Sequence, residues 1–394
     1  MDNKKSVSIP ERINNITSML DNTSIDSIVD FKNINDLSIV NYTKSQDIRE
    51  LMPKKYLDFI KAIKQIGGNL VYFKSGSTGH TFKGVYPSEE LKKTPYAVKV
   101  VAYPKKENYG DMYNIKRPEN AELLMIRLLS FFVINKQTPH IVLPVTTFNT
   151  SIKPFLSLSK DNIIDNKRYD QFLKRYHKGE YYSNVSILIS EWANGGDLLD
   201  YLRKNFRTFK IKHWRILFYQ ILSVLAIIQA KYPCFRHNDL KANNILINLF
   251  DVSPKKYKYI INGQTYIIPN VGFHIKLWDY DFASIKGIVN NSKVDSEWTT
   301  KINISCEQNR YYDVHYFFNT LTRKGFFPEF WTEPEIPEKA QDFINRIIPE
   351  KYKSGKYVSD KGRILSSEEY NTPDEILKND IFFKVFRENL NDSE

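Results

Sequence analysis

Two short stretches of sequence decide the fold: Phe235–Ile247 (FRHNDLKANNILI) and Ile275–Ala283 (IKLWDYDFA). In the first stretch, the mostly polar residues 237–244 come directly before three apolar residues, 245–247. The apolar residues predict a short buried strand, so the polar side chains are expected in the loop at the mouth of that strand. The plainer interpretation of the loop is a turn rich in Asn and Asp.

Asp239, Asn244 and, in the second stretch, Asp279 are the residue types that phosphoryl transfer requires. In that reaction one carboxylate accepts a hydroxyl proton, and an Asn–Asp pair holds the metal ion that neutralises phosphate charge. Because three fixed residue types also recur by chance, the loop alone does not decide the chemistry. The rest of the chain has to supply the context.

Length and composition indicate a globular protein of two parts. The chain has 394 residues, of which 42% are hydrophobic, enough for one large bilobal unit or two domains. Its formal net charge of +12 favours acidic partners such as nucleotides, nucleic acid or an anionic membrane surface, although simple solubility explains the charge equally well. Only two cysteines occur, which excludes a disulfide framework or a cysteine-based metal cluster and fits an intracellular, cytoplasmic location.

We expect neither a signal peptide nor a membrane-spanning segment. Residues 1–10 have no apolar core after their lysines, unlike a signal peptide. No apolar run approaches the ~20 residues needed to cross a bilayer, and the longest candidate, Ile221–Ala230, predicts a buried helix.

The chain is expected to divide into three parts. Residues 1–52 form a partly ordered N-terminal extension with a short helix near Ile13–Leu20. Residues 53–192 form a small β-rich lobe with a polar insertion at about 151–184, and residues 193–394 form a larger helical lobe with an insertion at about 249–272. The predicted fold class is therefore α+β.

Apolar stripes predict the helices, and alternation of apolar and polar residues predicts the strands. The predicted helices are Lys54–Ile66, one that opens at Pro118, Tyr169–His177 and His213–Ala230. The predicted strands are Asn69–Phe73, Thr81–Tyr86, Tyr96–Val101, His140–Thr147 and Val185–Glu191. The pair Asn262-Gly263, between two β-prone runs, predicts a β-hairpin.

A glycine-containing turn, Lys74–Phe82, and a lysine in a following strand form a second candidate site. Glycine lets backbone N–H groups approach a phosphate, although an ordinary hairpin turn is the plainer interpretation. Lys99 stands inside an apolar strand, where a cation needs a partner unless it snorkels from an edge strand. Of the two acidic residues on the next helix, Glu119 and Glu122, we prefer Glu122 because it lies beside the apolar face.

In chain order these are a glycine turn, a strand lysine, a helix glutamate, His-x-Asp with Asn five residues after the Asp, and a strand-borne Asp. The set resembles the eukaryotic-type protein kinase superfamily, serine/threonine type, from about residue 67 to residue 383. Residues 189–198 (ISEWANGGDL) are similar to the family's hinge, Asp313 to the aspartate that braces the catalytic loop, and residues 372–383 (TPDEILKNDIFF) to its closing helix. The overall texture, rich in Asn, Ile, Lys and Tyr, is similar to the divergent kinases of large DNA viruses.

The resemblance implies a bilobal kinase fold that uses ATP and Mg²⁺, with Mn²⁺ as the alternative metal, and a protein substrate with a Ser or Thr acceptor. It implies that Lys99 contacts the α- and β-phosphates while Glu122 holds it, and that the backbone from Glu191 to Ala193 binds the adenine edge. The ATP phosphates would be covered by backbone amides of Gly76, Ser77, Thr78 and Gly79.

The same resemblance assigns the chemistry to four further side chains. Asp239 would orient and deprotonate the substrate hydroxyl, and Lys241 would steady the charge of the transferred phosphoryl group. Asn244 and Asp279 would bind Mg²⁺.

Several residues depart from the family pattern. Lys74 replaces the first glycine of the phosphate loop. No Ala-Pro-Glu closes the activation segment, so the resemblance does not predict the shape of the peptide-substrate site. Asn238 replaces the arginine that binds a phosphorylated activation loop in many members, which implies activity without that phosphorylation. Asp281 replaces the glycine of the "DFG" element and either caps a turn or adds a carboxylate at the metal.

Three alternatives remain open at this point. A small-molecule kinase of the choline or aminoglycoside type shares the core fold and the two aspartate motifs. A pseudokinase would bind nucleotide as a scaffold without transfer. The basic insertion could contact nucleic acid or an anionic surface through Lys167, Arg168, Lys174, Arg175 and Lys178. The plainer interpretation of these residues is a solvated helix face.

Overall fold

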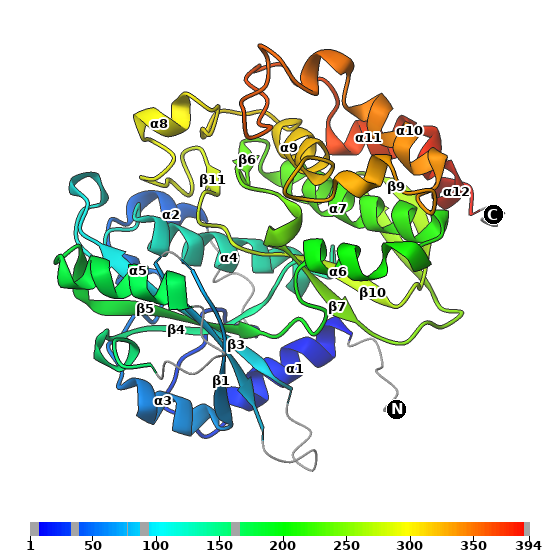
Figure 1. Cartoon of the computed structure of the whole chain (residues 1–394). Coiled ribbons are helices and arrows are strands. Elements are labelled where there is room, and N and C mark those ends of the chain that lie inside the picture. The colour runs from blue at the N-terminus through cyan, green and yellow to red at the C-terminus, as the bar shows by residue number, and fades with distance from the viewer. Residues whose placement is uncertain (1–7, 33–38, 77, 87–93, 159–165, 390–394) are drawn as a thin grey trace. The chain divides into compact units, whose positions relative to one another are not determined.

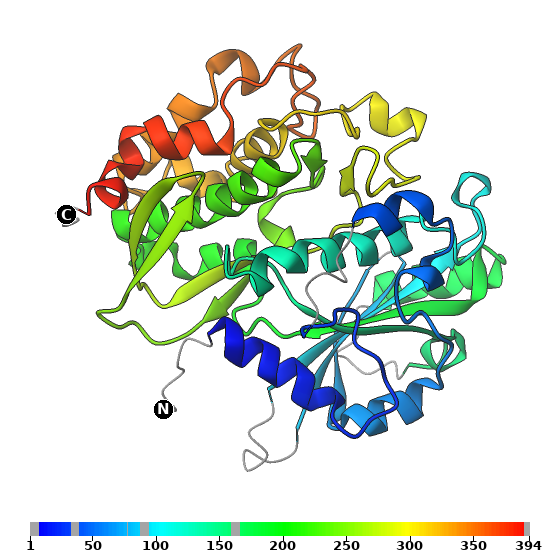
Figure 2. The same cartoon turned by 180° about the vertical axis from the view of Figure 1, so that it is seen from behind.

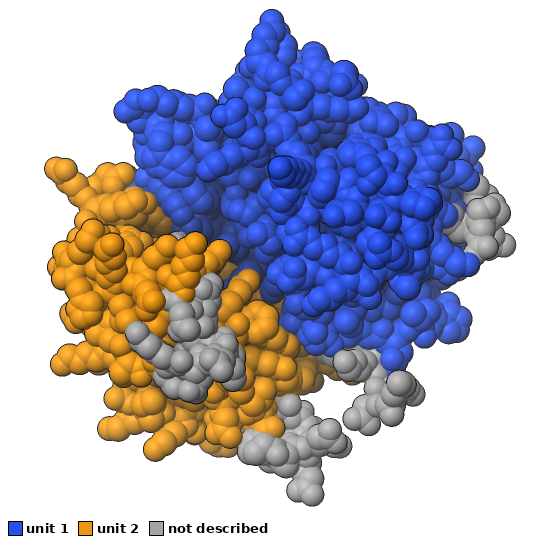
Figure 3. All heavy atoms as spheres, viewed as in Figure 1, with its two compact units in different colours: residues 1–7, 132–141, 193–394 blue, residues 8–131, 142–192 orange. Residues whose placement is uncertain are grey.

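The computed structural model describes residues 8–32, 39–76, 78–86, 94–158 and 166–389. The chain divides into two compact units, coloured separately in Figure 3. Residues 8–131 and 142–192 form the unit that we call the sheet unit, and residues 132–141 and 193–394 belong to the helical unit. A β-sheet dominates the first and helices dominate the second, which confirms the predicted α+β class.

The sheet unit is built on one antiparallel sheet with strand order β1-β2-β3-β5-β4 (Figure 1). From Tyr96 to Val101 alternate residues of β3 are buried, the period expected of a strand with one face on a core. The strands are β1 (Asn69–Ser75), β2 (Gly79–Val85), β3 (Tyr96–Pro104), β4 (Pro144–Ser151) and β5 (Tyr181–Glu191). Four of the five predicted strands are confirmed, each with at least one end shifted by a few residues.

The fifth predicted strand, His140–Thr147, is wrong at its start, because β4 begins only at Pro144. His140 belongs to the helical unit, where its ring is buried and bonded at both nitrogens. Nδ1 lies 3.0 Å from the carbonyl oxygen of Ile275, and Nε2 lies 3.0 Å from the hydroxyl of Tyr259. These contacts are with distant segments, so alternation along the chain could not indicate them.

The N-terminal extension is part of the sheet unit and covers its edge strand, β4. Ile28 donates its N–H to the carbonyl of Val145 at 3.1 Å, and Leu57 donates to Asn149 at 2.9 Å. An exposed edge strand presents unpaired backbone groups, so this cover satisfies them within the chain. The extension contains the helices α1 (Ile9–Leu20) and α2 (Ile39–Lys44), and α1 packs against α3 (Phe59–Ile66), which follows the extension (Figure 2).

Capping sets the starts of α1 and α3. Ser8 and Glu11 form a capping box, so α1 begins at Ile9, earlier than the predicted short helix. The start predicted for α3, Lys54, is wrong, because Asp58 caps the helix by accepting the N–H of Lys61 at 2.9 Å. The unit also holds the predicted helix α5 (Asn166–His177) and all but the last three residues of the predicted helix α4 (Pro118–Ile134).

The helical unit is organised around α7 (Ile211–Lys231), which packs against the hairpin strand β8, strand β10 and helices α10 and α11. Among the described residues, α7 is the one helix with the length and hydropathy to cross a membrane, and 83% of that stretch is buried inside the structure. This confirms the predicted buried helix. The other helices are α6 (Leu198–Asn205), α8 (Glu297–Thr300), α9 (Tyr312–Leu321), α10 (Glu338–Ile347), α11 (Pro373–Asn379) and α12 (Lys384–Arg387).

Within the described residues, three two-stranded ribbons complete the helical unit, with pairs β7–β10, β6–β11 and β8–β9. The predicted hairpin is confirmed as β8–β9, and Asn262 and Gly263 both have positive φ, as a tight hairpin turn requires. The strands are β6 (Phe235–Arg236), β7 (Ile245–Leu249), β8 (Lys256–Ile261), β9 (Gln264–Pro269), β10 (Phe273–Leu277) and β11 (Ser284–Ile285).

Candidate active site

The lysine of β3 and the glutamate of α4 are paired within the sheet unit. Lys99 Nζ lies 2.6 Å from Glu122 Oε1, and both side chains are largely buried. Glu119 instead binds Arg117, Nε to Oε2, at 3.1 Å. The preference for Glu122 as the partner of Lys99 is therefore confirmed.

The glycine turn joins β1 to β2, and its backbone is bonded on both sides. Gly76 donates its N–H to the carbonyl of Gly79 at 2.8 Å, and the carbonyl of Thr78 accepts the N–H of Ala102 at 2.8 Å. Gly79 has a packing reason to be glycine, because an added Cβ would lie 1.8 Å from the carbonyl oxygen of Val100. Ser77 lies outside the described residues, and contact of the turn with phosphates stays a prediction.

Glu191, at the end of β5, has its carboxylate fixed by the N-terminal helix. Arg12 of α1 donates from Nε to Oε2 at 3.0 Å and from Nη2 to Oε1 at 2.5 Å, and Leu143 donates its N–H to Oε1 at 2.8 Å. Bidentate pairs of this kind fix geometry as well as charge. Ala193, the other predicted adenine contact, is the buried first residue of the helical unit's longer segment.

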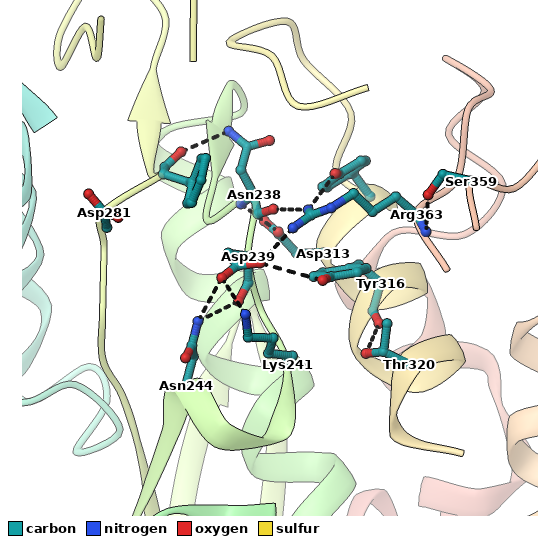
Figure 4. Close-up of polar contacts among 12 residues, drawn as sticks. Asn238, Asp239, Lys241, Asn244, Asp281, Asp313, Tyr316, Thr320, Ser359 and Arg363 are labelled. Atoms are coloured by element: carbon teal, nitrogen blue, oxygen red, sulfur yellow. Dashed lines mark hydrogen bonds and ion pairs between the residues drawn. The ribbon is translucent and has the colours of Figure 1, made fainter. Parts of the chain in front are cut away.

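In the helical unit, Asp239 is the centre of a cluster of donors (Figure 4). Its Oδ2 accepts from Lys241 Nζ at 2.7 Å and from Asn244 Nδ2 at 3.0 Å. Its Oδ1 accepts from Arg363 Nη2 at 2.6 Å and from the Tyr316 hydroxyl at 3.4 Å. The structure therefore brings together three predicted site residues, Asp239, Lys241 and Asn244, and adds two that the sequence did not indicate.

Asp313 of α9 fixes the backbone of the same loop. Its fully buried carboxylate accepts the N–H of His237 at 2.7 Å and the N–H of Asn238 at 2.9 Å. Burial raises the pKa of Asp313 above the usual range, while His237 and the two N–H groups oppose that rise. The predicted bracing of the loop by Asp313 is confirmed.

The register of the β7–β10 ribbon places Asn244 and Asp279 at one end of it. Ile245 pairs with Leu277, so Asn244, directly before β7, and Asp279, two residues after β10, flank the same end. Asn244 commits its amide nitrogen to the carbonyl and carboxylate of Asp239, which leaves its amide oxygen as a ligand. An amide oxygen and a carboxylate are hard donors of the kind that Mg²⁺ takes, together with water and phosphate oxygens, so these residues fit that ion.

Asp281, two residues further on, forms an ion pair with Lys293. Its carboxylate is partly exposed, and its backbone carbonyl accepts from Asn291 at 3.0 Å. Asp281 therefore has a cationic partner, Lys293, within the helical unit. Neither of the two roles predicted for this residue is tested by these contacts.

Two arginines of the basic helix α5 bind groups within the sheet unit. Arg175 Nε lies 2.7 Å from Glu180 Oε2, and its guanidinium lies over the ring of Tyr181. Arg168 donates from Nη1 to the carbonyl of Ser75 at 3.4 Å. Contact of this helix with nucleic acid or an anionic surface stays a prediction.

Besides Tyr316, sequence reasoning missed two arginines of the site, Arg12 and Arg363. Each binds a carboxylate far away in the chain, Arg12 with Glu191 and Arg363 with Asp239. Arg12 carries no signal in the sequence, because one arginine in an amphipathic helix is ordinary. The one signal for Arg363 is that Asn238 stands where many family members have an arginine, which leaves the loop without that cation.

Comparison with known proteins agrees with this geometry. The family model described as "Poxvirus serine/threonine protein kinase" matches residues 111–386. The putative serine/threonine-protein kinase R400 of Acanthamoeba polyphaga mimivirus is 47% identical over 346 residues, which cover 85% of this chain and 73% of that protein. Serine/threonine-protein kinase 2 of fowlpox virus (strain NVSL) is 29% identical over 246 residues, 60% of this chain and 50% of that protein.

Swinepox virus serine/threonine-protein kinase 2 (strain Kasza) is 33% identical over 141 residues, 34% of this chain and 28% of that protein. These matches confirm the resemblance to serine/threonine kinases, and to those of large DNA viruses in particular. The match to the family model begins at residue 111 of this chain, so the glycine turn and Lys99 lie outside it. With 276 of 394 residues inside that match, the chain belongs to the poxvirus serine/threonine protein kinase family.

Proposed function

We propose that this chain transfers the γ-phosphoryl group of ATP to a serine or threonine hydroxyl of a protein, with Mg²⁺, and needs no phosphorylation of its activation segment. The observation that carries the proposal is the arrangement at Asp239. One carboxylate oxygen faces Lys241 and Asn244, and the other is held by Arg363. The Asp239 carboxylate thus lies between a buried guanidinium, a partly exposed lysine and an amide that would ligate a metal ion.

The reaction assigns one task to each group. The substrate hydroxyl gives its proton to Asp239 while its oxygen bonds to the γ-phosphorus, and the bond from that phosphorus to the ADP oxygen breaks. Lys241 offsets charge on the transferred group. Asn244 and Asp279 would hold Mg²⁺, which when bound neutralises charge on the phosphate oxygens. In the sheet unit, Lys99 would contact the α- and β-phosphates while Glu122 holds Lys99 in place.

Independence from phosphorylation is supported by the contacts of Asn238. Its amide nitrogen donates to the carbonyl of Phe282 at 3.0 Å and to the carbonyl of Ser305 at 3.0 Å. Its amide oxygen accepts the N–H of Ser305 at 3.4 Å. Neutral hydrogen bonds thus tie the catalytic loop to the segment after β10, where many kinases use an arginine and a phosphate.

The test is transfer of label from γ-labelled ATP to protein, with Mg²⁺, comparing the parent with Asp239→Asn. Acidic protein, basic protein and choline are offered in turn as acceptors. Label on protein serine or threonine, lost in Asp239→Asn and retained in the exposed control Asp251→Asn, supports the proposal. Label on choline alone, or nucleotide binding without turnover in the parent, overturns it.

The regulatory part has its own test. The purified chain is treated with a phosphatase, the phosphatase is removed, and the initial rate of transfer is measured. Because the side-chain amide of Asn238 bonds to neutral groups of the described residues, the rate should be unchanged. A large loss of rate that returns after incubation with ATP would overturn this part while leaving the transfer activity in place.

A further inference from the structure

Arg363 stands in a tight loop that α9 holds in place. Ser359 and Arg363 close the loop, with the N–H of Ser359 donating to the Arg363 carbonyl at 2.8 Å and the Arg363 N–H donating to Ser359 Oγ at 3.0 Å. Gly362 turns the chain with a φ of +84°, and its carbonyl accepts from Asn319 of α9 at 3.1 Å. The base of the Arg363 side chain is therefore fixed by backbone and helix contacts.

The guanidinium of Arg363 is fixed as firmly as its backbone. Besides Asp239, it donates from Nη1 to the hydroxyl of Tyr312 at 2.9 Å and to the carbonyl of Asn238. The guanidinium carbon, Cζ, lies 3.9 Å from the centre of the Tyr316 ring. Tyr316 follows Tyr312 by one helical turn on α9. Burial opposes the charge of Arg363, but Tyr312, Tyr316 and Asp239 raise its pKa above the usual arginine value.

The two oxygens of Asp239 are held in different ways. A carboxylate offers about four acceptor positions, and four donors approach this one. On Oδ2, the cation is Lys241, whose side chain is 24% exposed and carries its charge on a flexible stem. On Oδ1, the cation is Arg363, whose side chain is 6% exposed and has three acceptors and a ring around it. Lys241 can move to a phosphate, whereas Arg363 cannot leave without breaking all these contacts.

We propose that Arg363 is a positioning residue for phosphoryl transfer: it fixes Asp239 through Oδ1, so that Oδ2 is the oxygen that receives the substrate proton. The inference rests on the proposed function. Asn238 is neutral, so the fixed cation of the catalytic loop comes from a loop more than a hundred residues later. Arg363 does not touch the substrate, and its effect passes through the orientation of Asp239.

The experiment compares Arg363→Ala and Arg363→Lys with the parent in steady-state phosphoryl transfer. A misplaced catalytic group costs about 10²-fold, so Arg363→Ala should lose about that factor in kcat and keep its KM for ATP. Arg363→Lys should lose at least about tenfold in kcat, because an ammonium lacks the planar fork that reaches Asp239 from Nη2 while Nη1 bonds Tyr312 and Asn238. Guanidinium ion at non-denaturing concentration should restore part of the kcat of Arg363→Ala and none of that of Arg363→Lys.

The control is Arg346→Ala, which removes a partly exposed arginine paired with Asp380 and should leave kcat unchanged. Loss of one partner of a buried ion pair can unfold a protein, so circular dichroism and thermal midpoints are measured for every variant. If Arg363→Ala does not fold, Arg363→Lys decides, since it keeps a buried charge beside Asp239. A folded Arg363→Lys with parental kcat, or a change confined to KM, overturns the proposal, whereas an inactive parent would overturn the proposed function itself.

Discussion

Replacing Lys54 by methionine should stabilise the protein at neutral pH. The Lys54 side chain is 2% exposed, and burial lowers its pKa from 10.5 to about 7. Its ammonium has two hydroxyl partners, Thr147 Oγ1 at 3.2 Å and Ser186 Oγ at 2.5 Å. Neither partner is a carboxylate, although Glu119 and Glu122 act on it through space and oppose the fall of the pKa.

The size of the effect follows from the pKa values. A base with a lowered folded-state pKa destabilises the folded state as the pH falls below the unfolded pKa, and the cost levels off below the folded pKa. With values of 10.5 and about 7, Lys54 costs about 4 kcal/mol of folding stability at pH 7 and about 1 kcal/mol at pH 9.5. Methionine loses two hydrogen bonds worth about 1 kcal/mol each. Lys54→Met should therefore gain about 2 kcal/mol of stability at pH 7 and lose about 1 kcal/mol at pH 9.5.

The assay is urea denaturation followed by circular dichroism at both pH values. Lys55→Met is the matched control, because Lys55 is exposed, with Asp26 as an exposed partner, and its replacement should change stability little at either pH. If Lys54→Met is less stable than the parent at pH 7, or if its gain does not shrink as the pH rises, the reasoning about the buried charge is wrong.

Substitutions at two glycines, one histidine and two aspartates test other parts of the structure. Gly79→Ala should lower the thermal midpoint strongly, because its Cβ would meet a backbone oxygen at 1.8 Å, whereas Gly76→Ala, with no contact nearer than 3.8 Å, should not; equal midpoints would contradict this. Burial lowers the pKa of His315 from 6.5 to about 4, so its contribution of about 3 kcal/mol is present above pH 6.5 and lost toward pH 4. His315→Gln should flatten that acid limb in urea midpoints, and an unchanged limb would refute the assignment. Asp279→Ala should abolish phosphoryl transfer while Asp281→Ala keeps it within about threefold, a difference below 1 kcal/mol; equal rates for Asp279→Ala and the parent would exclude Asp279 as the metal ligand.

The parts of the site that the sequence predicted are those fixed by local spacing. Asp239, Lys241 and Asn244 stand within six residues, so one loop brings them together. The Lys99–Glu122 pair was predictable because a strand period and a helix period each point one side chain toward the core. Asp313 was predictable only through the family resemblance, since its distance along the chain carries no periodic signal.

What the sequence could not predict are contacts between segments with no period. Arg363 reaches Asp239 from an irregular loop, and Arg12 reaches Glu191 from an extension that composition alone would leave loosely ordered. The wrong starts of α3 and β4 have a related cause. Lys54 and His140 are polar residues buried by partners far along the chain. The local pattern therefore assigned them the helix or strand of the residues that follow them.

The cover of β4 by residues 28 and 57 has a practical consequence for work with shortened versions of this protein. A version that begins at residue 53 would keep the second of these backbone bonds but lose the first, together with α1 and the guanidinium that neutralises Glu191. Part of a sheet margin would then be open to a second molecule. Such a version should self-associate to a greater degree as its concentration rises. A drop in its activity would then have to be tested for aggregation before it is attributed to a catalytic defect.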